Sequence, residues 1–328
     1  MRGRQAVNGA VRSHLAGRGY LEVETPRLAK TPIPESHLEL FRTSLLRSGQ
    51  SPEELYLLPS PEYRLKQLLA EGSGNIFEIA RAFRNMEEVG PFHEPEFSML
   101  EFYTVDADAG DSIAITEELL RAVVGALPQG LIDGDVDAAL RDIAPYPTMT
   151  VAEAFHRQAG IDLEKNLSRD EFESTVRQLG MKVSVEDSWE DLFQRVFLSY
   201  VEPKLPTARP LFLTDYPAAI PTLAGNKEGT PWADRWELYF RGQELANCYG
   251  EERDPDRIAA FFASEAAAKE AHGKIAHPVD PEYLQRPGET LPRCSGVALG
   301  LDRLLMILVG ANSLAGVIYF PISDIVTK

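Results

Sequence analysis

The sequence has few cysteines and no long apolar run. Its two cysteines, Cys248 and Cys294, lack the CxxC or Cys/His spacing of a metal site and are too few for a disulfide framework. No stretch approaches the roughly 18 apolar residues that a membrane-spanning helix needs. The charged first residues are not followed by the apolar segment of a signal peptide. We therefore expect a cytoplasmic protein without a membrane segment.

Basic side chains are scarce relative to acidic ones. The 328 residues include 33 lysines and arginines against 50 aspartates and glutamates, a formal net charge of −17. Proteins that bind a nucleic-acid backbone usually carry a basic surface. The charge therefore disfavours broad nucleic-acid binding, although it leaves room for a local basic patch.

Glycine and proline are scattered along the chain. The 24 glycines and 23 prolines form no linker, repeat or low-complexity tract. Apolar residues make up 44% of the chain, which is enough for a large core. We expect one globular domain over residues 1–328, with a partly helical insertion around residues 110–200.

The first quarter of the chain alternates helical and extended patterns. Apolar spacing predicts a helix over residues 5–18, followed by a strand that ends at Pro26. A second helix is predicted to start at Glu62, because Ser60 is a good N-cap and Pro61 suits the first helical turn.

The rest of the chain mixes strands and helices. Its predicted strands cover residues 75–84, 96–105, 211–251 and 296–300, and its predicted helices cover residues 110–126, much of 150–200, and 301–309. Gly310 is expected to end the last helix.

The strand over residues 96–105 has one unusual face. A period of two places Phe97, Met99, Glu101 and Tyr103 on the same side. A buried carboxylate between such neighbours is costly unless it is paired. This face therefore either lines a wet pocket or is a solvent-exposed stripe, and the periodicity leaves both open.

A second polar pattern lies between residues 236 and 251. Asn247 and Glu251 share a strand face, while Glu237 and Glu244 would fall on opposite faces of a regular strand. A bulge at Gly242 would bring the two carboxylates together, and a hard cation such as Mg²⁺ prefers such oxygen ligands. The spacing alone favours two exposed strand glutamates over metal ligands.

A small-residue strand from Gly296 to Gly300 leads straight into a helix that carries Arg303. Glycines permit a ligand to approach the backbone closely, and a helix start favours negative charge. The guanidinium of Arg303 would add a cation whose shape suits phosphate. A structural glycine at a tight strand–helix junction is an equally simple explanation.

Together these segments resemble the three signature motifs of class II aminoacyl-tRNA synthetases, and the lysyl-tRNA synthetase catalytic domain in particular. Gly19 to Pro26 resembles motif 1, Phe83 to Tyr103 resembles motif 2, and Ala298 to Arg303 resembles motif 3. The resemblance implies an α+β fold with a six-stranded antiparallel sheet flanked by helices. It also implies a homodimer formed partly through the motif 1 proline, Pro26.

The resemblance assigns ATP-binding roles residue by residue. It implies that Arg84 holds the substrate carboxylate against the α-phosphate through charge-assisted bonds, and that Arg303 binds the γ-phosphate, which makes these two arginines the catalytic candidates. Phe97 would stack on adenine. Glu237 and Glu244 would hold Mg²⁺ and ATP.

The resemblance also implies a pocket for a lysine-like substrate. Two carboxylates and a phenol around one ammonium would replace its hydration and reject uncharged competitors. The implied substrate-binding residues are Glu62 for the α-amino group, Glu101, Tyr103 and Glu251 for the ε-ammonium, together with Asn247 and Ala298.

Two features of the sequence differ from lysyl-tRNA synthetases and indicate a more specific family. Only about one helix precedes the motif 1 segment, where those enzymes have an anticodon-binding barrel, so we expect no such domain in this chain. Ala298 stands where they have the first glycine of motif 3. Both features are similar to the elongation factor P lysine ligase family, which activates (R)-β-lysine, or less well α-lysine, and transfers it to a lysine of elongation factor P. The acceptor is then not tRNA.

The motif 2 loop departs from the usual pattern. The segment from Arg84 to Glu87 has one residue more than usual, and Glu94 replaces the usual asparagine. The sequence therefore does not fix the register of residues 86–94. We still assign Glu87 and His93 to ATP binding by resemblance.

Other functions stay open at this point. The chain could be a truncated lysyl-tRNA synthetase-like enzyme that makes lysyl-adenylate for another acceptor, or a non-catalytic regulatory paralogue. Retention of Arg84, Phe97 and Arg303 speaks against the paralogue. An asparagine-synthetase-like relative fits less well, because Glu101 and Glu251 suit an ammonium better than a carboxylate. The sequence does not choose between α- and β-lysine.

Overall fold

The protein is built around a large sheet. The computed structural model describes residues 1–86, 90–141, 145–271, 273–274, 277–280 and 290–326. Its eight-stranded sheet has, in spatial order, β1 (Leu21–Glu22), β5 (Ile76–Phe83), β6 (Glu96–Val105), β11 (Cys294–Gly300), β10 (Gln243–Gly250), β9 (Arg235–Phe240), β8 (Leu211–Thr214) and β7 (Thr148–Thr150).

The six inner strands are antiparallel, from β5 to β8. The two edge strands, β1 and β7, pair with their neighbours in parallel. The predicted α+β fold with an antiparallel sheet is therefore confirmed, with two short parallel strands added at its edges. The predicted strand over residues 211–251 is in fact three strands, with an irregular segment between β8 and β9.

Side-chain alternation gives the sheet two different faces. On β6, Leu100 and Phe102 are fully buried in the main apolar core. Met99, Glu101 and Tyr103 alternate with them and lie on the opposite face. The face predicted from the period of two is thus confirmed.

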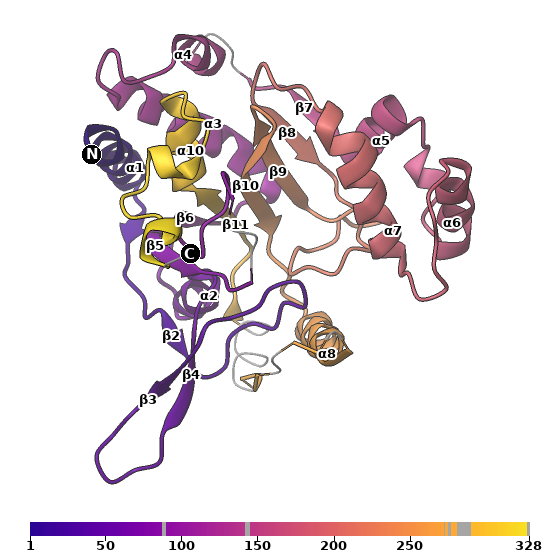
Figure 1. The fold of residues 1–328 in the computed structure, drawn as a ribbon, viewed down its shortest axis with the longest axis horizontal. Helices are drawn as coiled ribbons and strands as arrows, with labels where there is room; N and C mark the ends of the chain where they lie inside the picture. The colour runs from indigo at the N-terminus through magenta and orange to yellow at the C-terminus, as the bar shows by residue number, and fades with distance from the viewer. Residues whose placement is uncertain (87–89, 142–144, 272, 275–276, 281–289, 327–328) are drawn as a thin grey trace.

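Helices close the apolar face of the sheet. Figure 1 shows three of them on one side, α1 (Arg2–Gly17), α3 (Ala109–Ala126) and α10 (Leu301–Leu308), with α4 (Gly134–Arg141) beside them. Helix α1 buries Val7, Val11 and Leu15 at helical spacing. An ion pair between Arg4 and the buried Asp302 joins α1 to α10.

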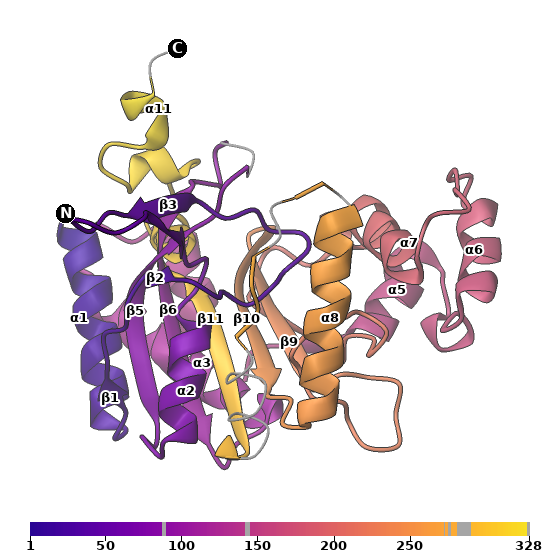
Figure 2. The same cartoon turned by 90° about the horizontal axis from the view of Figure 1, so that it is seen from below.

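The other face is covered differently. Helices α2 (Glu62–Ala70) and α8 (Pro255–Ala271) lie there, in front of the strands in Figure 2. A small sheet of β2 (Leu28–Ala29), β4 (Glu53–Leu57) and β3 (Arg42–Leu45) projects from this part of the molecule (Figure 1). The chain ends with two short helices, η4 (Leu314–Gly316) and α11 (Ile322–Ile325).

The predicted strand up to Pro26 was wrong in its extent. Within this predicted strand, only Leu21 and Glu22 pair with β5. Proline has no N–H and cannot continue a ladder. Around Pro26, hydrogen bonds between side chains connect this segment to β5 instead. The carboxylate of Glu78, on β5, accepts hydrogen bonds from the Thr25 hydroxyl at 2.7 Å and from Arg27 at 2.9 Å.

The predicted cap of α2 was also wrong. Pro61, not Ser60, occupies the N-cap position. The Ser60 hydroxyl accepts a hydrogen bond from the backbone N–H of Glu62 at 2.9 Å and donates its own proton to Glu101 at 2.6 Å. The buried carboxylate of Glu101 therefore engages the one hydrogen that the hydroxyl can donate.

The helical insertion begins later than predicted. Helices α3 and α4 pack in the main core. A separate apolar cluster that includes Phe155 and Phe193, whose rings stack at 4.9 Å, holds the insertion together. Its elements are α5 (Val151–Ala159), η1 (Leu163–Lys165), α6 (Arg169–Gln178), α7 (Trp189–Val196), η2 (Phe197–Val201) and η3 (Glu202–Lys204).

No helix within the described ranges is both long and apolar enough to cross a bilayer.

Candidate active site

Two hollows lie side by side on the polar face of the sheet. The first, here called the arginine pocket, has a volume of about 280 Å³ and is lined by Arg84 and Arg303. The second, the acidic pocket, has about 130 Å³ and is lined by five glutamates: Glu35, Glu62, Glu101, Glu251 and Glu265. The two pockets share four lining residues, Arg84, Met99, Asn247 and Ala298.

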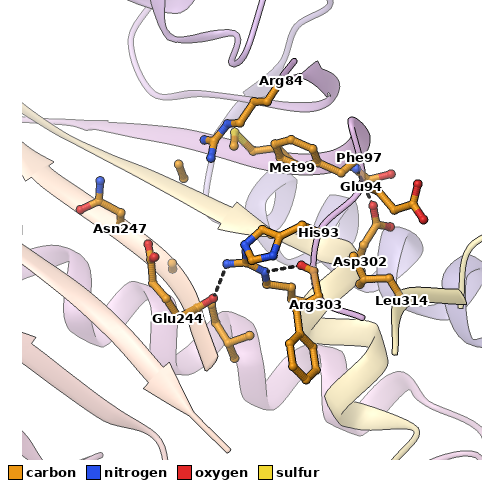
Figure 3. A pocket seen from close by; sticks show the side chains of 16 residues that line it. Arg84, His93, Glu94, Phe97, Met99, Glu244, Asn247, Asp302, Arg303 and Leu314 are labelled. Atoms are coloured by element: carbon orange, nitrogen blue, oxygen red, sulfur yellow. Dashed lines mark hydrogen bonds between the residues drawn. The ribbon is translucent and has the colours of Figure 1, made fainter. Parts of the chain in front are cut away.

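The two arginines reach the arginine pocket from different elements. Arg84 follows the last residue of β5, and its guanidinium lies over the Phe97 ring at 5.2 Å. Arg303 belongs to the first turn of α10 and donates to the backbone oxygens of Phe92 at 3.2 Å and Glu244 at 3.1 Å. Figure 3 shows the two guanidiniums on opposite sides of the hollow in this view. Two fixed cations beside an aromatic face suit a polyanion attached to a flat ring.

Strand β10 is irregular where Glu244 lies. Its register against β9 shifts between Glu244 and Ala246, so the bulge is not at Gly242 as predicted. Arg241 and Gly242 instead form the tight turn between the strands, both with positive φ, a conformation that glycine adopts freely. The shift still brings Glu244 to the polar face, where it lines the arginine pocket.

Glu237 is enclosed by donors. Its carboxylate accepts hydrogen bonds from Arg235 and from the hydroxyls of Tyr216 and Tyr239. It lines neither of the two pockets. Burial and the charge of Glu237 raise the pKa of the neighbouring Glu244 to about 7.

Glu244 lines the arginine pocket and offers a carboxylate to a divalent cation there, whereas the carboxylate of Glu237 lies behind it, engaged by Arg235 and two tyrosines. In the part of the chain that the structure describes, no group of three or more His, Cys, Asp or Glu side chains surrounds a metal position. Mg²⁺ needs only one or two carboxylates when phosphates and water supply its other ligands. The donor set therefore fits Mg²⁺ bound together with a phosphate compound.

Glu101 is the central group of the acidic pocket. Its side chain is only 3% exposed and accepts hydrogen bonds from Ser60 and, at 3.4 Å, from the Tyr103 hydroxyl. Burial, together with the charge of Glu62, raises the pKa of Glu101 to about 8 against the lowering effect of the bond from Ser60. A cationic ligand would remove this penalty.

A glycine keeps the acidic pocket open. Gly296 on β11 pairs with Tyr103 on β6. A Cβ at position 296 would overlap the Tyr103 ring and lie 2.5 Å from Oε1 of Glu251. Only glycine therefore leaves space between these two side chains.

Lys66 was missed by the sequence reasoning. Its Nζ lies 2.6 Å from Oε1 of Glu62 and 2.5 Å from Oε2 of Glu251. Burial raises the pKa of Glu251 to about 7 even though the Lys66 charge acts to lower it. The i,i+4 spacing of Glu62 and Lys66 could have indicated their ion pair, but no sequence pattern indicated the contact of Lys66 with Glu251.

The sequence did not predict two other elements beside the acidic pocket. They are α8 and the loop that contains Glu35 and Ser36, here called the covering loop. The backbone N–H of Ser36 donates to Glu265 at 2.6 Å, and Lys274 donates to the backbone oxygen of Ser36 at 2.6 Å. Burial and the charge of Glu62 raise the pKa of Glu35, in the same loop, to about 7. The buried positions of α8, Ile258, Phe262, Glu265 and Lys269, follow helical spacing and could have revealed the helix.

Arg235 fixes the boundary between the pockets. Its guanidinium lies over the rings of Tyr216 at 4.3 Å and Tyr249 at 5.5 Å. Its Nε donates to Oδ1 of Asn247 at 3.1 Å. A permanently charged side chain thus holds Asn247, which both pockets share.

The structure gathers most of the predicted site residues. Arg84, His93, Phe97, Glu244, Asn247, Ala298 and Arg303 line the arginine pocket, and Glu62, Glu101, Tyr103, Asn247, Glu251 and Ala298 line the acidic pocket. Glu237 lies beside Glu244 without lining either pocket. Glu87 lies outside the described residues.

Known proteins resemble the chain over almost its whole length. The family described as class II tRNA synthetases (D, K and N) matches residues 1–324. An elongation factor P–(R)-β-lysine ligase of Yersinia enterocolitica is 36% identical over 327 residues, 97% of this chain and 94% of that protein. Ligases of the same name from Sodalis glossinidius and Salmonella dublin are also 36% identical, with the same coverage of both chains.

The buried carboxylate of Glu101 is expected to make stability fall as pH rises. Its pKa is about 8 in the folded protein against an ordinary 4.5. Between these values the folded state keeps a proton that the unfolded state has lost, so the free energy of unfolding falls by at most about 1.4 kcal/mol per pH unit. Glu101→Gln should therefore melt higher than the wild type at about pH 9 and close to it at about pH 5.

Thermal unfolding of both proteins across this range is the measurement. Glu96→Gln, at the exposed start of the same strand, is the matched control. A Glu101→Gln effect of the same size at both pH values would contradict the prediction.

Proposed function

The chain belongs to the class II tRNA synthetase family, and within it to the family of elongation factor P–(R)-β-lysine ligases, and from this membership we propose that it is such a ligase. In the proposed reaction, ATP activates (R)-β-lysine or α-lysine as an acyl-adenylate. The acyl group then passes to a lysine side chain of elongation factor P.

The meeting of the two pockets at Arg84 is the observation that carries the proposal. Adenylate formation requires a carboxylate and an α-phosphate side by side. The arginine pocket offers cations for phosphates, and the acidic pocket offers carboxylates for ammonium groups. A lysine whose amino groups occupy the acidic pocket would bring its carboxylate to Arg84, at the shared wall.

The activation step needs positioning and charge compensation only. A carboxylate oxygen of lysine attacks the α-phosphorus, and the bond from that phosphorus to the bridging oxygen breaks, which releases pyrophosphate. We propose that Arg84 and Arg303 offset the charge of the phosphates and that Phe97 stacks on adenine, a contact worth about 1–3 kcal/mol. In transfer, the acceptor amine attacks the acyl carbon, AMP leaves, and the amine loses a proton.

The acidic pocket supports a diamino acid as the substrate. We propose that Glu101, Tyr103 and Glu251 receive the ε-ammonium, since the buried carboxylate of Glu101 is costly to ionise without a cation beside it. Glu62 would receive the other amino group. Ala298 lies at the wall shared with the arginine pocket, where its methyl group bears on the choice between α- and β-lysine.

We propose that Glu244 and Glu237 hold Mg²⁺ together with the ATP phosphates. The ion would supply positive charge for the phosphates as pyrophosphate leaves. His93 lines the same pocket and is proposed, with Glu87, to bind ATP.

A protein acceptor fits the charge of the chain. The formal net charge of −17 disfavours tRNA, and the relatives are named for a protein substrate. A ligase for a translation factor would work in the cytoplasm. We also propose that residues 1–328 act as one catalytic domain, because one sheet contains strands from both ends of the chain.

Modification of elongation factor P is the direct test of this function. We expect incubation with the protein, ATP, Mg²⁺ and either lysine isomer to add one lysyl group to a single lysine, as measured by mass spectrometry. Arg84→Ala should slow the modification by at least about a hundredfold, since it removes a cation that stabilises the transition state. Arg81→Ala, an exposed arginine on the same strand, is the control.

The other outcomes separate the alternatives. Pyrophosphate exchange with lysine but no modified elongation factor P would indicate another acceptor. Absence of both activities in the wild type would indicate a non-catalytic paralogue and overturn the proposal.

The magnesium proposal predicts a change in metal dependence. Glu244→Gln should raise severalfold the Mg²⁺ concentration needed for half-maximal pyrophosphate exchange, because a neutral amide is a weaker ligand for a hard cation. Glu164→Gln, in the helical insertion, should leave the Mg²⁺ dependence unchanged. An unchanged dependence in Glu244→Gln would remove this residue from the metal site.

Two exposed leucines beside Pro26 support a homodimer. Leu21 is 57% exposed and Leu28 is 42% exposed, and exposed apolar side chains on either side of Pro26 in the sequence are candidates for burial in an interface. We expect light scattering to give a dimer for the wild type and a monomer for Leu28→Arg. Leu198→Arg, which changes a leucine of the insertion that is 56% exposed, should stay dimeric. A monomeric wild type at micromolar concentration would contradict the proposal.

A further inference from the structure

A buried ammonium lies behind the wall of the acidic pocket. The side chain of Lys66 is 3% exposed and does not line the pocket. Its Nζ nevertheless forms ion pairs with two carboxylates that do line it, Glu62 and Glu251. The proposed reaction has no step for Lys66, so its place needs another explanation.

Each ion pair uses one carboxylate oxygen. Lys66 contacts Oε1 of Glu62 and Oε2 of Glu251. The other oxygen of Glu251, Oε1, lies toward Gly296, where an added Cβ would approach it to 2.5 Å. Lys66 therefore fixes one oxygen of Glu251 at the wall and leaves the other directed to the open space beside Tyr103.

The charges of the pocket floor can be counted. Glu62, Glu101 and Glu251 form this floor and carry three negative charges when ionised, and Lys66 supplies one positive charge. The net charge of these four groups, before the other charged residues of the pocket are included, is −2, which two ammonium groups would balance. Two further glutamates, Glu35 and Glu265, come from the covering loop and α8, while Arg84 stands at the boundary with the arginine pocket.

We infer that Lys66 is a specificity-determining positioning residue, which sets the charge of the pocket floor so that it fits a substrate with two ammonium groups. This inference rests on the proposed function. Without Lys66, Glu62 and Glu251 would lose the cation that they share, and burial would favour the protonated form of Glu251 more strongly than it does with Lys66 in place. A protonated Glu251 would bind an ammonium group weakly. It would bind an uncharged side chain as well as the ionised form does.

The test compares lysine with norleucine, which has the same chain without the ε-ammonium. Calorimetric binding and pyrophosphate exchange are measured for the wild type, Lys66→Met, Lys66→Arg and the control Lys165→Met. Lys165 is an exposed lysine of the insertion that also pairs with a carboxylate, Asp162. Thermal melting of each variant establishes that it is folded.

Lys66→Met is expected to reduce the preference for lysine over norleucine by about tenfold or more, which corresponds to about one pKa unit at a floor carboxylate. The loss should appear in KM and in the binding constant for lysine, with a smaller change in kcat. Lys66→Arg should restore part of the preference, and Lys165→Met should match the wild type.

A double variant separates charge from packing. If Lys66 acts by compensating Glu251, Lys66→Met combined with Glu251→Gln should discriminate no worse than Glu251→Gln alone. This pair also provides the test if Lys66→Met alone does not fold. Equal losses for lysine and norleucine, or an unchanged preference, would overturn the inference.

The inference and the proposed function fail in different ways. A wild type that binds lysine but does not modify elongation factor P would overturn the proposed acceptor, and the Lys66 inference would then be decided by the binding preference alone. A wild type that binds neither amino acid would overturn both.

Discussion

The alternation of side chains across the antiparallel sheet is the constraint on which the rest of the structure depends. Leu100 and Phe102 of β6 are buried in the core that α1, α3 and α10 share, and the alternating residues Met99, Glu101 and Tyr103 line the acidic pocket. The apolar face stabilises the sheet enough to keep several carboxylates on the other face out of water. The raised pKa values of Glu101 and Glu251 indicate that ionising these buried carboxylates costs free energy until a cation binds.

Arg84 lies at the boundary between two pockets of opposite charge. On one side lie cations and an aromatic ring, and on the other lie carboxylates. A zwitterionic or diamino acid has its charges arranged in the same order, with a carboxylate at one end and ammonium groups beyond it. In the proposed function, the order of charges along the two pockets would select both the substrate and the end of it that reaches the phosphate, without a covalent protein intermediate.

Local patterns placed the strands and helices of this site, and the resemblance to class II synthetases assigned the roles of its residues. The two faces of β6 follow from a period of two, and the junction of β11 and α10 follows from its glycines and the apolar helix after it. Contacts between distant segments were not predictable in this way. Lys66 reaches Glu251 and Ser36 reaches Glu265 only after α2 and α8 pack on the sheet. The bulge lies next to Glu244 because Gly242 is needed in the tight turn, a choice that spacing alone does not reveal.

The most direct test is a crystal structure of the protein with a non-hydrolysable lysyl-adenylate analogue, in which a sulfamate replaces the phosphate. The account predicts adenine against Phe97, the sulfamate beside Arg84, and the ε-ammonium within hydrogen-bonding distance of Glu101 and Glu251. An analogue bound with its ammonium outside the acidic pocket, or with Arg84 turned away from the sulfamate, would contradict the claim that the two pockets together form one site for amino-acid activation.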